Sequence, residues 1–117
     1  ILGSGDQVRC YTYGGDLARG IVESLEIRAA RNEDFNLSTA RSTTVRELAE
    51  IIWRHVHGPG RQLEFVCDDP FPHDVQQRVP DVSKAHDLLG FIADTPIDQV
   101  LDELVPWIAR AIDEGLV

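Results

Sequence analysis

Residues 44–60, TVRELAEIIWRHVHGPG, carry the clearest structural signal in this chain of 117 residues. Thr44 and Glu47 fit a capping box, in which each side chain accepts a hydrogen bond from the other residue's backbone N–H. An apolar stripe at helical spacing follows, made of Val45, Leu48, Ile52 and Val56. The segment Gly58-Pro59-Gly60 cannot continue a helix. The sequence therefore predicts a helix from Val45 to about His57.

Three further helices are expected around this one. The first runs from Leu17 to about Ile27, with Asp16 as its N-cap, because its carboxylate can accept hydrogen bonds from the free N–H groups of a helix start. A short helix capped by Asp81 or Ser83 ends at Gly90. The last begins at residues 95–97, where proline takes the favoured first helical position.

Three short strands are expected between the helices, at residues 8–13, 35–37 and 63–66. The long loop Cys67–Pro80 is expected to lie over a single core. Three strands are too few for a doubly wound sheet. The prediction is therefore a mixed α/β fold with about four helices, three short strands and no complete Rossmann sheet.

The length and the net charge of the chain limit the number of domains and the classes of binding partner. The chain is long enough for one domain. Its 11 Lys and Arg against 20 Asp and Glu give a net charge of −9 and an isoelectric point near 4.7. We therefore expect no broad binding to nucleic acid or to an anionic membrane, which rely on basic surface. No apolar run is long enough to span a membrane.

The start of the chain carries neither an initiator Met nor the regions of a signal peptide. We expect it to be a cut inside a longer, cytoplasmic protein. The two cysteines, Cys10 and Cys67, do not make a disulfide framework and are expected to be free thiols; a disulfide or a reactive thiol is the alternative.

No complete catalytic set is present. The sequence has no glycine-rich dinucleotide or phosphate-loop motif and no serine nucleophile elbow. No tyrosine stands four residues before a lysine. Two of the four histidines, His55 and His57, are two residues apart and so point to different faces of a helix. We therefore predict no catalytic, cofactor-binding or metal-binding residues in this chain.

A polar set on strand ends and on the long loop is the candidate binding site. It comprises Arg9, Asn36, His73, Asp74 and Arg78. Ligands on α/β scaffolds bind at such places. Two guanidinium groups in one pocket can grip a diphosphate, and Asp74 can accept from a sugar or ribose hydroxyl. The alternative for each arginine is a solvated or salt-bridged surface residue.

Four segments resemble motifs of the extended short-chain dehydrogenases/reductases that act on nucleotide sugars. Residues 9–21, RCYTYGGDLARGI, are similar to R-x-[F/Y]-x-[Y/H]-V-x-D-x-A-x-[A/G]. Residues 35–38 and 44–49 are similar to the pattern [Y/F]-N-[I/V]-G … [S/T]-x-x-E-L-A. Residues 74–91 resemble D-x-x-x-R-x-P-D-[I/V]-[S/T]-K-A … L-L-G-[W/F]. Order and spacing agree over most of the chain.

This resemblance implies that residues 1–117 are the C-terminal substrate-binding domain of an NAD-dependent epimerase, dehydratase or decarboxylase, an isomerase or a lyase. It implies that NAD and the catalytic Tyr-Lys pair belong to an N-terminal Rossmann domain absent from this chain, which would be the lobe's partner along with a nucleotide-diphosphate sugar. Arg9 and Arg78 match arginines that contact the diphosphate. Asn36 matches a substrate-site asparagine, and His73 and Asp74 fall on the loop against the nucleotide.

Two departures from the family pattern stand out. Gly14-Gly15 replaces the usual Val and acidic residue before Asp16. Residues 71–74, Phe-Pro-His-Asp, stand where epimerases often have Arg-Pro-Gly-Asp, so one phosphate contact is missing. Both a UDP-glucose 4-epimerase-like and a UDP-glucuronate decarboxylase-like lobe remain open, as does the oligomeric state. The alternative function is an interaction module that keeps the fold without binding a nucleotide.

Overall fold

Helix α2 (Val45–His57) begins where the capping box predicts. In the computed structural model, which describes residues 1–116, the Thr44 hydroxyl accepts from the Glu47 N–H at 3.0 Å. The Glu47 carboxylate accepts from the Thr44 N–H at 2.7 Å. Gly58, with a positive φ of 78°, ends the helix. Both boundaries of this helix are confirmed.

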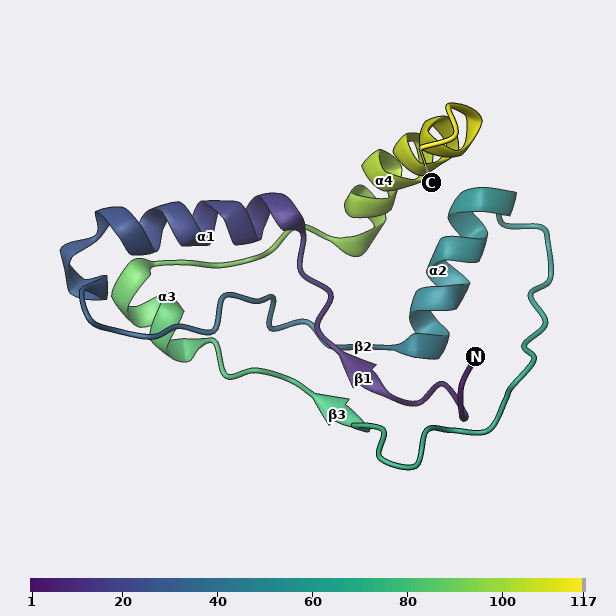
Figure 1. Cartoon of the computed structure of the whole chain (residues 1–117), viewed down its shortest axis with the longest axis horizontal. Helices are drawn as coiled ribbons and strands as arrows, with labels where there is room; N and C mark the ends of the chain where they lie inside the picture. Colours follow the sequence, from purple (N-terminus) through teal and green to yellow (C-terminus); the bar gives the residue numbers. More distant parts are fainter. Residues whose placement is uncertain (117) are drawn as a thin grey trace.

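The other helices follow the expected order, with differences at their starts (Figure 1). They are α1 (Gly14–Glu26), the 3-10 turn η1 (Arg28–Ala30), α3 (Ser83–Leu89) and α4 (Ile97–Asp113). Asp16 was expected to be the N-cap of α1, and this prediction is wrong. Tyr13 is the cap and Gly14-Gly15 open the first turn, because glycine tolerates helical backbone angles as well as turn angles.

The two C-terminal helices start within a residue or two of the prediction. The Asp81 carboxylate accepts from the Ser83 N–H at 2.9 Å and from the Ser83 hydroxyl at 2.6 Å, while Val82 is the N-cap of α3. Gly90 ends α3 in the left-handed conformation, with φ of 68°. Pro96 is the N-cap of α4 and not its first helical residue.

A small mixed sheet joins three segments that lie far apart in the sequence. Its strands are β1 (Val8–Arg9), β2 (Thr43–Thr44) and β3 (Gln77–Arg78), in the order β2-β1-β3. β1 pairs antiparallel with β2 and parallel with β3. The α/β class and the number of strands in this sheet agree with the prediction.

The positions of two strands were predicted wrongly, and the first is shorter than expected. Residues 35–37 and 63–66 are not strands. Phe35 and Leu37 pack against the core cluster, so their apolar alternation reflects side-chain burial and not strand pairing. The strands that do form are polar pairs, Thr43–Thr44 and Gln77–Arg78, which carry no apolar alternation to reveal them.

The core is small and lies under α1 and α3. It contains Ala30, Ala85, Leu89, Phe91 and Ala93. The Cys67–Pro80 loop does not cover it, contrary to expectation. The loop runs along the opposite edge of the molecule and pairs with the N-terminal segment instead (Figure 1): Gly3 N–H donates to the Asp68 carbonyl and Asp68 N–H to the Ile1 carbonyl, each at 2.9 Å.

Several apolar side chains stay outside this core. The stripe Leu17, Ile21 and Leu25 on α1 is 39%, 47% and 80% exposed, and Trp107 on α4 is 55% exposed. Among residues 1–116, no large side chain is completely buried. None of the helices in this part of the chain combines the length and apolar character that crossing a bilayer requires.

Candidate functional site

The pairing of β1 with β3 brings two of the predicted arginines together. In the parallel register Arg9 lies opposite Arg78, and neighbouring strands are about 4.8 Å apart. Beside them is a cavity of about 540 Å³ that also contains Asn36. The complete lining is Arg9, Cys10, Asn36, Ser38, Gln77, Arg78, Val79 and Pro80. Three of the five candidate residues therefore share one cavity, which we call the arginine cavity.

The charge of this cavity is opposite to that of the chain. Its lining includes two arginines and no Asp or Glu, although the chain as a whole carries −9. Arg78 is exposed, and within residues 1–116 its side chain forms no salt bridge. An anionic group such as a phosphate suits two arginines, because a guanidinium can donate two parallel hydrogen bonds to its oxygens.

Arg9 is the more firmly held of the two arginines. Its Nη1 donates to the Val8 carbonyl at 2.8 Å, and its Nη2 lies 3.5 Å from the Asp74 carboxylate. About three-quarters of its side chain is buried. A guanidinium has five N–H donors, so these two contacts leave Arg9 with donors for a ligand.

Asn36 and Ser38 are fixed by contacts with neighbouring segments. The Asn36 amide donates to the Asp81 carbonyl at 2.9 Å, which leaves its side-chain oxygen as an acceptor. The Ser38 hydroxyl lies 3.0 Å from the Thr12 hydroxyl, and Thr12 also accepts from the Thr39 N–H at 3.1 Å. These bonds hold the wall of the cavity opposite the sheet.

The remaining two candidates lie apart from the arginine cavity. Asp74 faces Arg9 from the other side, in a second cavity of about 260 Å³ that also contains Gln7 and Phe71. His73 is exposed and lines neither of these two cavities. The structure thus places Asp74 against Arg9 and leaves His73 outside the group.

Sequence reasoning missed Gln7, Cys10 and Ser38. Gln7 is two residues before Arg9 and therefore on the same side of an extended chain, a signal that strand periodicity offers. Cys10 lines the arginine cavity, and burial raises the pKa of its thiol above the ordinary value. Because a raised pKa favours the neutral thiol, Cys10 is a wall residue and not an activated nucleophile.

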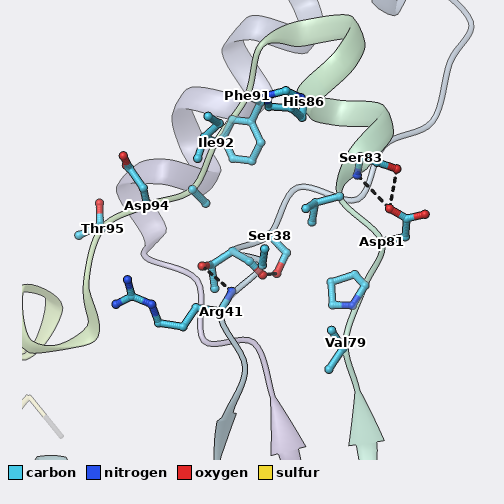
Figure 2. Close-up of a pocket in the computed structure, with 15 residues that line it drawn as sticks. Ser38, Arg41, Val79, Asp81, Ser83, His86, Phe91, Ile92, Asp94 and Thr95 are labelled. Atoms are coloured by element: carbon cyan, nitrogen blue, oxygen red, sulfur yellow. Dashed lines mark hydrogen bonds between the residues drawn. The ribbon is translucent and has the colours of Figure 1, made fainter.

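Figure 2 shows a larger cavity, of about 640 Å³. Its lining shares Ser38, Val79 and Pro80 with that of the arginine cavity, so the two adjoin. Its lining includes the apolar residues Phe91 and Ile92 and the acidic residues Asp81 and Asp94, and the Asp81 carboxylate is turned to Ser83. Hydrogen bonds from the Ser83 hydroxyl and N–H hold the pKa of Asp81 below its ordinary value, so this carboxylate is ionised at neutral pH.

The start of helix α1 does not fit the diphosphate of a dinucleotide cofactor. Such a group needs a glycine-rich turn leading into a helix whose N–H groups are free. Helix α1 starts on Gly14-Gly15, but Asp16 lies in its first turn and Glu103 accepts from the Tyr13 hydroxyl beside it at 2.8 Å. Asp16 is already paired with Arg19, and the Glu103 carboxylate beside this helix start repels another anion.

Known proteins resemble this chain in sequence and in fold. A family model described as GDP-mannose 4,6 dehydratase matches residues 1–104. UDP-glucuronic acid decarboxylase 1 of Xenopus tropicalis is 27% identical over 97% of this chain. The UDP-glucose 4-epimerase of Thermotoga maritima, solved with UDP-glucose, superimposes with a TM-score of 0.84 at 29% identity over 96% of this chain.

A third protein has the same fold at lower identity. It is the UDP-glucuronic acid 4-epimerase of Bacillus cereus, solved with UDP-glucuronic acid and NAD, with a TM-score of 0.83 and 23% identity over 94% of this chain. The chain spans 26% of the length of the Xenopus protein, 35% of the Thermotoga protein and 34% of the Bacillus protein. It corresponds to about a third of these proteins or less.

Proposed function

We propose that this chain, which belongs to the GDP-mannose 4,6-dehydratase family of extended short-chain dehydrogenases/reductases, is the nucleotide-sugar-binding lobe of an NAD-dependent epimerase, dehydratase or decarboxylase. The observation that carries the proposal is the arginine cavity. Although the chain is acidic, the lining of one cavity of about 540 Å³ includes two arginines and no Asp or Glu. In this proposal Arg9 and Arg78 bind the diphosphate, and Asn36 contributes its free side-chain oxygen.

The two neighbouring cavities suit the rest of such a ligand. A sugar or nucleoside joined to the diphosphate can cross the shared wall into the cavity of about 640 Å³. There its hydroxyl groups would meet the Asp94 carboxylate, and its apolar face would meet Phe91. On the other side, Asp74 would accept from a hydroxyl group next to Arg9, while exposed His73 would contact only the outer part of the ligand.

We propose that NAD is bound by the part of the related proteins that this chain does not span. We propose that residues 1–117 act as one substrate-binding domain, that they catalyse no reaction alone, and that a Rossmann domain supplies both NAD and the catalytic pair. The misfit of a dinucleotide diphosphate at the start of α1 supports this division. The cytoplasmic location stays a prediction.

Isothermal titration calorimetry with UDP, UDP-glucose, UDP-glucuronic acid and dTDP-glucose tests the proposal. We expect weak binding of at least one UDP compound, since part of the ligand surface would be covered only by another domain. A folded sample that binds none of the four compounds would contradict nucleotide binding.

Arg78→Ala tests the role of the more exposed arginine. Losing its charge-assisted hydrogen bonds should weaken binding by about 1.5–3 kcal/mol. Arg31→Ala is the matched control, because Arg31 is also exposed and lies outside the lining of the arginine cavity. Equal affinities of Arg78→Ala and the wild type for the nucleotide would show that Arg78 does not contribute to binding.

A second candidate function is an interaction module that has lost nucleotide binding. The exposed apolar stripe Leu17, Ile21 and Leu25 on α1 favours it, because a surface of this kind often binds another protein. A substrate lobe that packs against a second domain would carry the same stripe. The calorimetry separates the two functions, since only the substrate lobe binds a nucleotide.

A further inference from the structure

A buried glutamine stands behind the arginine cavity. Gln7 is 5% exposed, one of two buried polar or charged residues among those the structure describes. Its Nε2 donates to the Asp74 Oδ2 at 2.8 Å and to the Leu2 carbonyl at 3.0 Å. Both N–H groups of the amide are therefore used. The amide orientation follows from these partners, because a flipped amide would set an oxygen against the carboxylate.

This arrangement leaves one polar atom without a partner. The Gln7 Oε1 is buried and accepts no hydrogen bond from residues 1–116. A buried acceptor without a partner destabilises the folded state. An apolar residue of the same size would avoid that cost but could not bind Asp74. The contact with Asp74 is therefore what the amide provides at this buried position.

The packing around the amide is close. Gly3 has a positive φ of 68°. A Cβ added to it would lie 3.3 Å from the Gln7 Nε2 and 3.3 Å from the Pro70 Cβ. A side chain at residue 3 would press on the amide. The glycine, the carbonyl of Leu2 and the loop at Pro70 thus enclose Gln7 in one position.

Asp74 is shared unequally between its two partners. Its Oδ2 is 2.8 Å from the Gln7 Nε2, whereas its Oδ1 is 3.5 Å from the Arg9 Nη2. A relaxed arginine–carboxylate pair closes to about 2.7–2.9 Å and often uses two N–H groups. The pair with Arg9 is therefore longer than a closed pair, whereas the bond to Gln7 is short.

We infer that Gln7 is a positioning residue that keeps the Asp74 carboxylate back from Arg9, so that the Arg9 guanidinium stays free for a diphosphate. The inference rests on the proposed function and deepens it. A carboxylate closed onto Arg9 would occupy the N–H groups that a phosphate needs and would neutralise its charge. Arg9 lines both the arginine cavity and the cavity of Asp74 and Gln7, so it is the point at which the two compete.

NMR titration of the full chain with inorganic pyrophosphate at pH 7 and low ionic strength tests this inference. Pyrophosphate has no ribose or sugar, so the hydroxyl contact proposed for Asp74 does not enter. Gln7→Leu should weaken binding about five- to tenfold, because Asp74 then closes onto Arg9. Gln99→Leu is the control, since Gln99 is exposed on α4.

The double variant gives the decisive result. Asp74→Asn removes the competing charge, so Gln7→Leu/Asp74→Asn should bind pyrophosphate at least as tightly as the wild type. A merely structural role for Gln7 predicts that the double variant stays weak. Gln7→Leu binding as tightly as the wild type, or a double variant that is not restored, would overturn the inference.

A second variant covers the case in which Gln7→Leu does not fold. Gln7→Met keeps the length of the side chain and has no N–H group for Asp74, so it should show the same loss and the same recovery with Asp74→Asn. A parallel titration with UDP distinguishes a failure of the proposed function from a failure of the role of Gln7. A wild type that binds neither pyrophosphate nor UDP refutes the proposed function and this role with it. A wild type that binds both, beside a Gln7 variant that binds equally well, refutes the role of Gln7 alone.

Discussion

Helices α1 and α2 are both 13 residues long, yet they are anchored in different ways. Helix α2 is fixed by its own sequence, through the reciprocal bonds of Thr44 and Glu47. Helix α1 has no side-chain cap. Its anchor comes from a distant segment, since the Asp16 carboxylate accepts from the Thr95 N–H at 3.1 Å and from the Arg19 guanidinium at 3.0 Å.

The two helices also differ in which face is buried. On α1 the buried residues are Asp16 and Gly20, about 120° around the helix from the stripe of Leu17, Ile21 and Leu25. Phe91 packs over Gly20 and is 2% exposed. A polar and a glycine position are thus turned inward while the apolar stripe faces outward. The buried face of α1 depends on the loop after α3, and its sequence period alone does not reveal it.

The largest loss of stability is expected from a substitution at Gly20, where α1 meets the core. A Cβ at this position would lie 2.7 Å from the Phe91 ring, so Gly20→Ala should destabilise the chain by about 1–3 kcal/mol despite the better helix propensity of alanine. Gly14→Ala is the matched control, because no atom lies within 4 Å of its added Cβ. Urea denaturation followed by circular dichroism measures both variants. Equal stabilities would contradict the packing of Phe91 on α1.

The fold was predictable where the signal is local. The capping box and the glycine after it define α2, and Gly90 defines the end of α3, because each acts on neighbouring residues. The strands Thr43–Thr44 and Gln77–Arg78 were not predictable, since two-residue polar strands form only when distant segments meet. The same holds for Asp16, whose partner is Thr95.

Asp16→Asn should remove the long-range anchor of α1. The change should destabilise the chain by about 1–3 kcal/mol at pH 7, because a charged acceptor with two donors is lost. Burial acts to raise the pKa of Asp16, but the hydrogen bonds from Thr95 and Arg19 outweigh it and leave the pKa below the ordinary value of 3.8.

The pH dependence of that variant gives a second measurement. A lowered native pKa stabilises the fold above the ordinary value, and this stabilisation is lost as the pH falls through the native value. The difference in the free energy of unfolding between Asp16→Asn and the wild type should therefore shrink from pH 5 towards pH 3. Asp69→Asn, an exposed carboxylate on the long loop, should show no such difference. A difference that is constant with pH would contradict the role of Asp16.

Thr44→Ala tests the local anchor of α2. Losing the cap should cost about 1 kcal/mol of stability at pH 7, measured by thermal denaturation. Hydrogen bonds from the Thr44 N–H and hydroxyl lower the pKa of Glu47, so its contribution is present above the ordinary pKa and is lost in acid. Glu47→Gln should keep the reciprocal bond and lose the acid dependence. A Thr44→Ala variant as stable as the wild type would leave α2 anchored by its packing on α4.

The candidate site was predictable in its arginines but not in its geometry. The family pattern pointed to Arg9, Arg78 and Asn36, which share one cavity. The sequence could not show that Asp74 lies on the other side of Arg9, because that depends on how the 67–80 loop meets the N-terminal segment. It also assigned His73 a place beside Asp74, and the structure leaves His73 exposed and outside the cavity.

The smallest effect is expected at Leu25, at the far end of the α1 stripe. Leu25 is 80% exposed, so Leu25→Gln should change the free energy of unfolding by no more than about 0.5 kcal/mol. Leu48→Gln on α2 is the matched control, a half-buried position that should cost more than about 1 kcal/mol. If Leu25→Gln cost as much as Leu48→Gln in a dilute, monomeric sample, the α1 stripe would be covered within the chain. The difference between the two helices would then be one of capping alone.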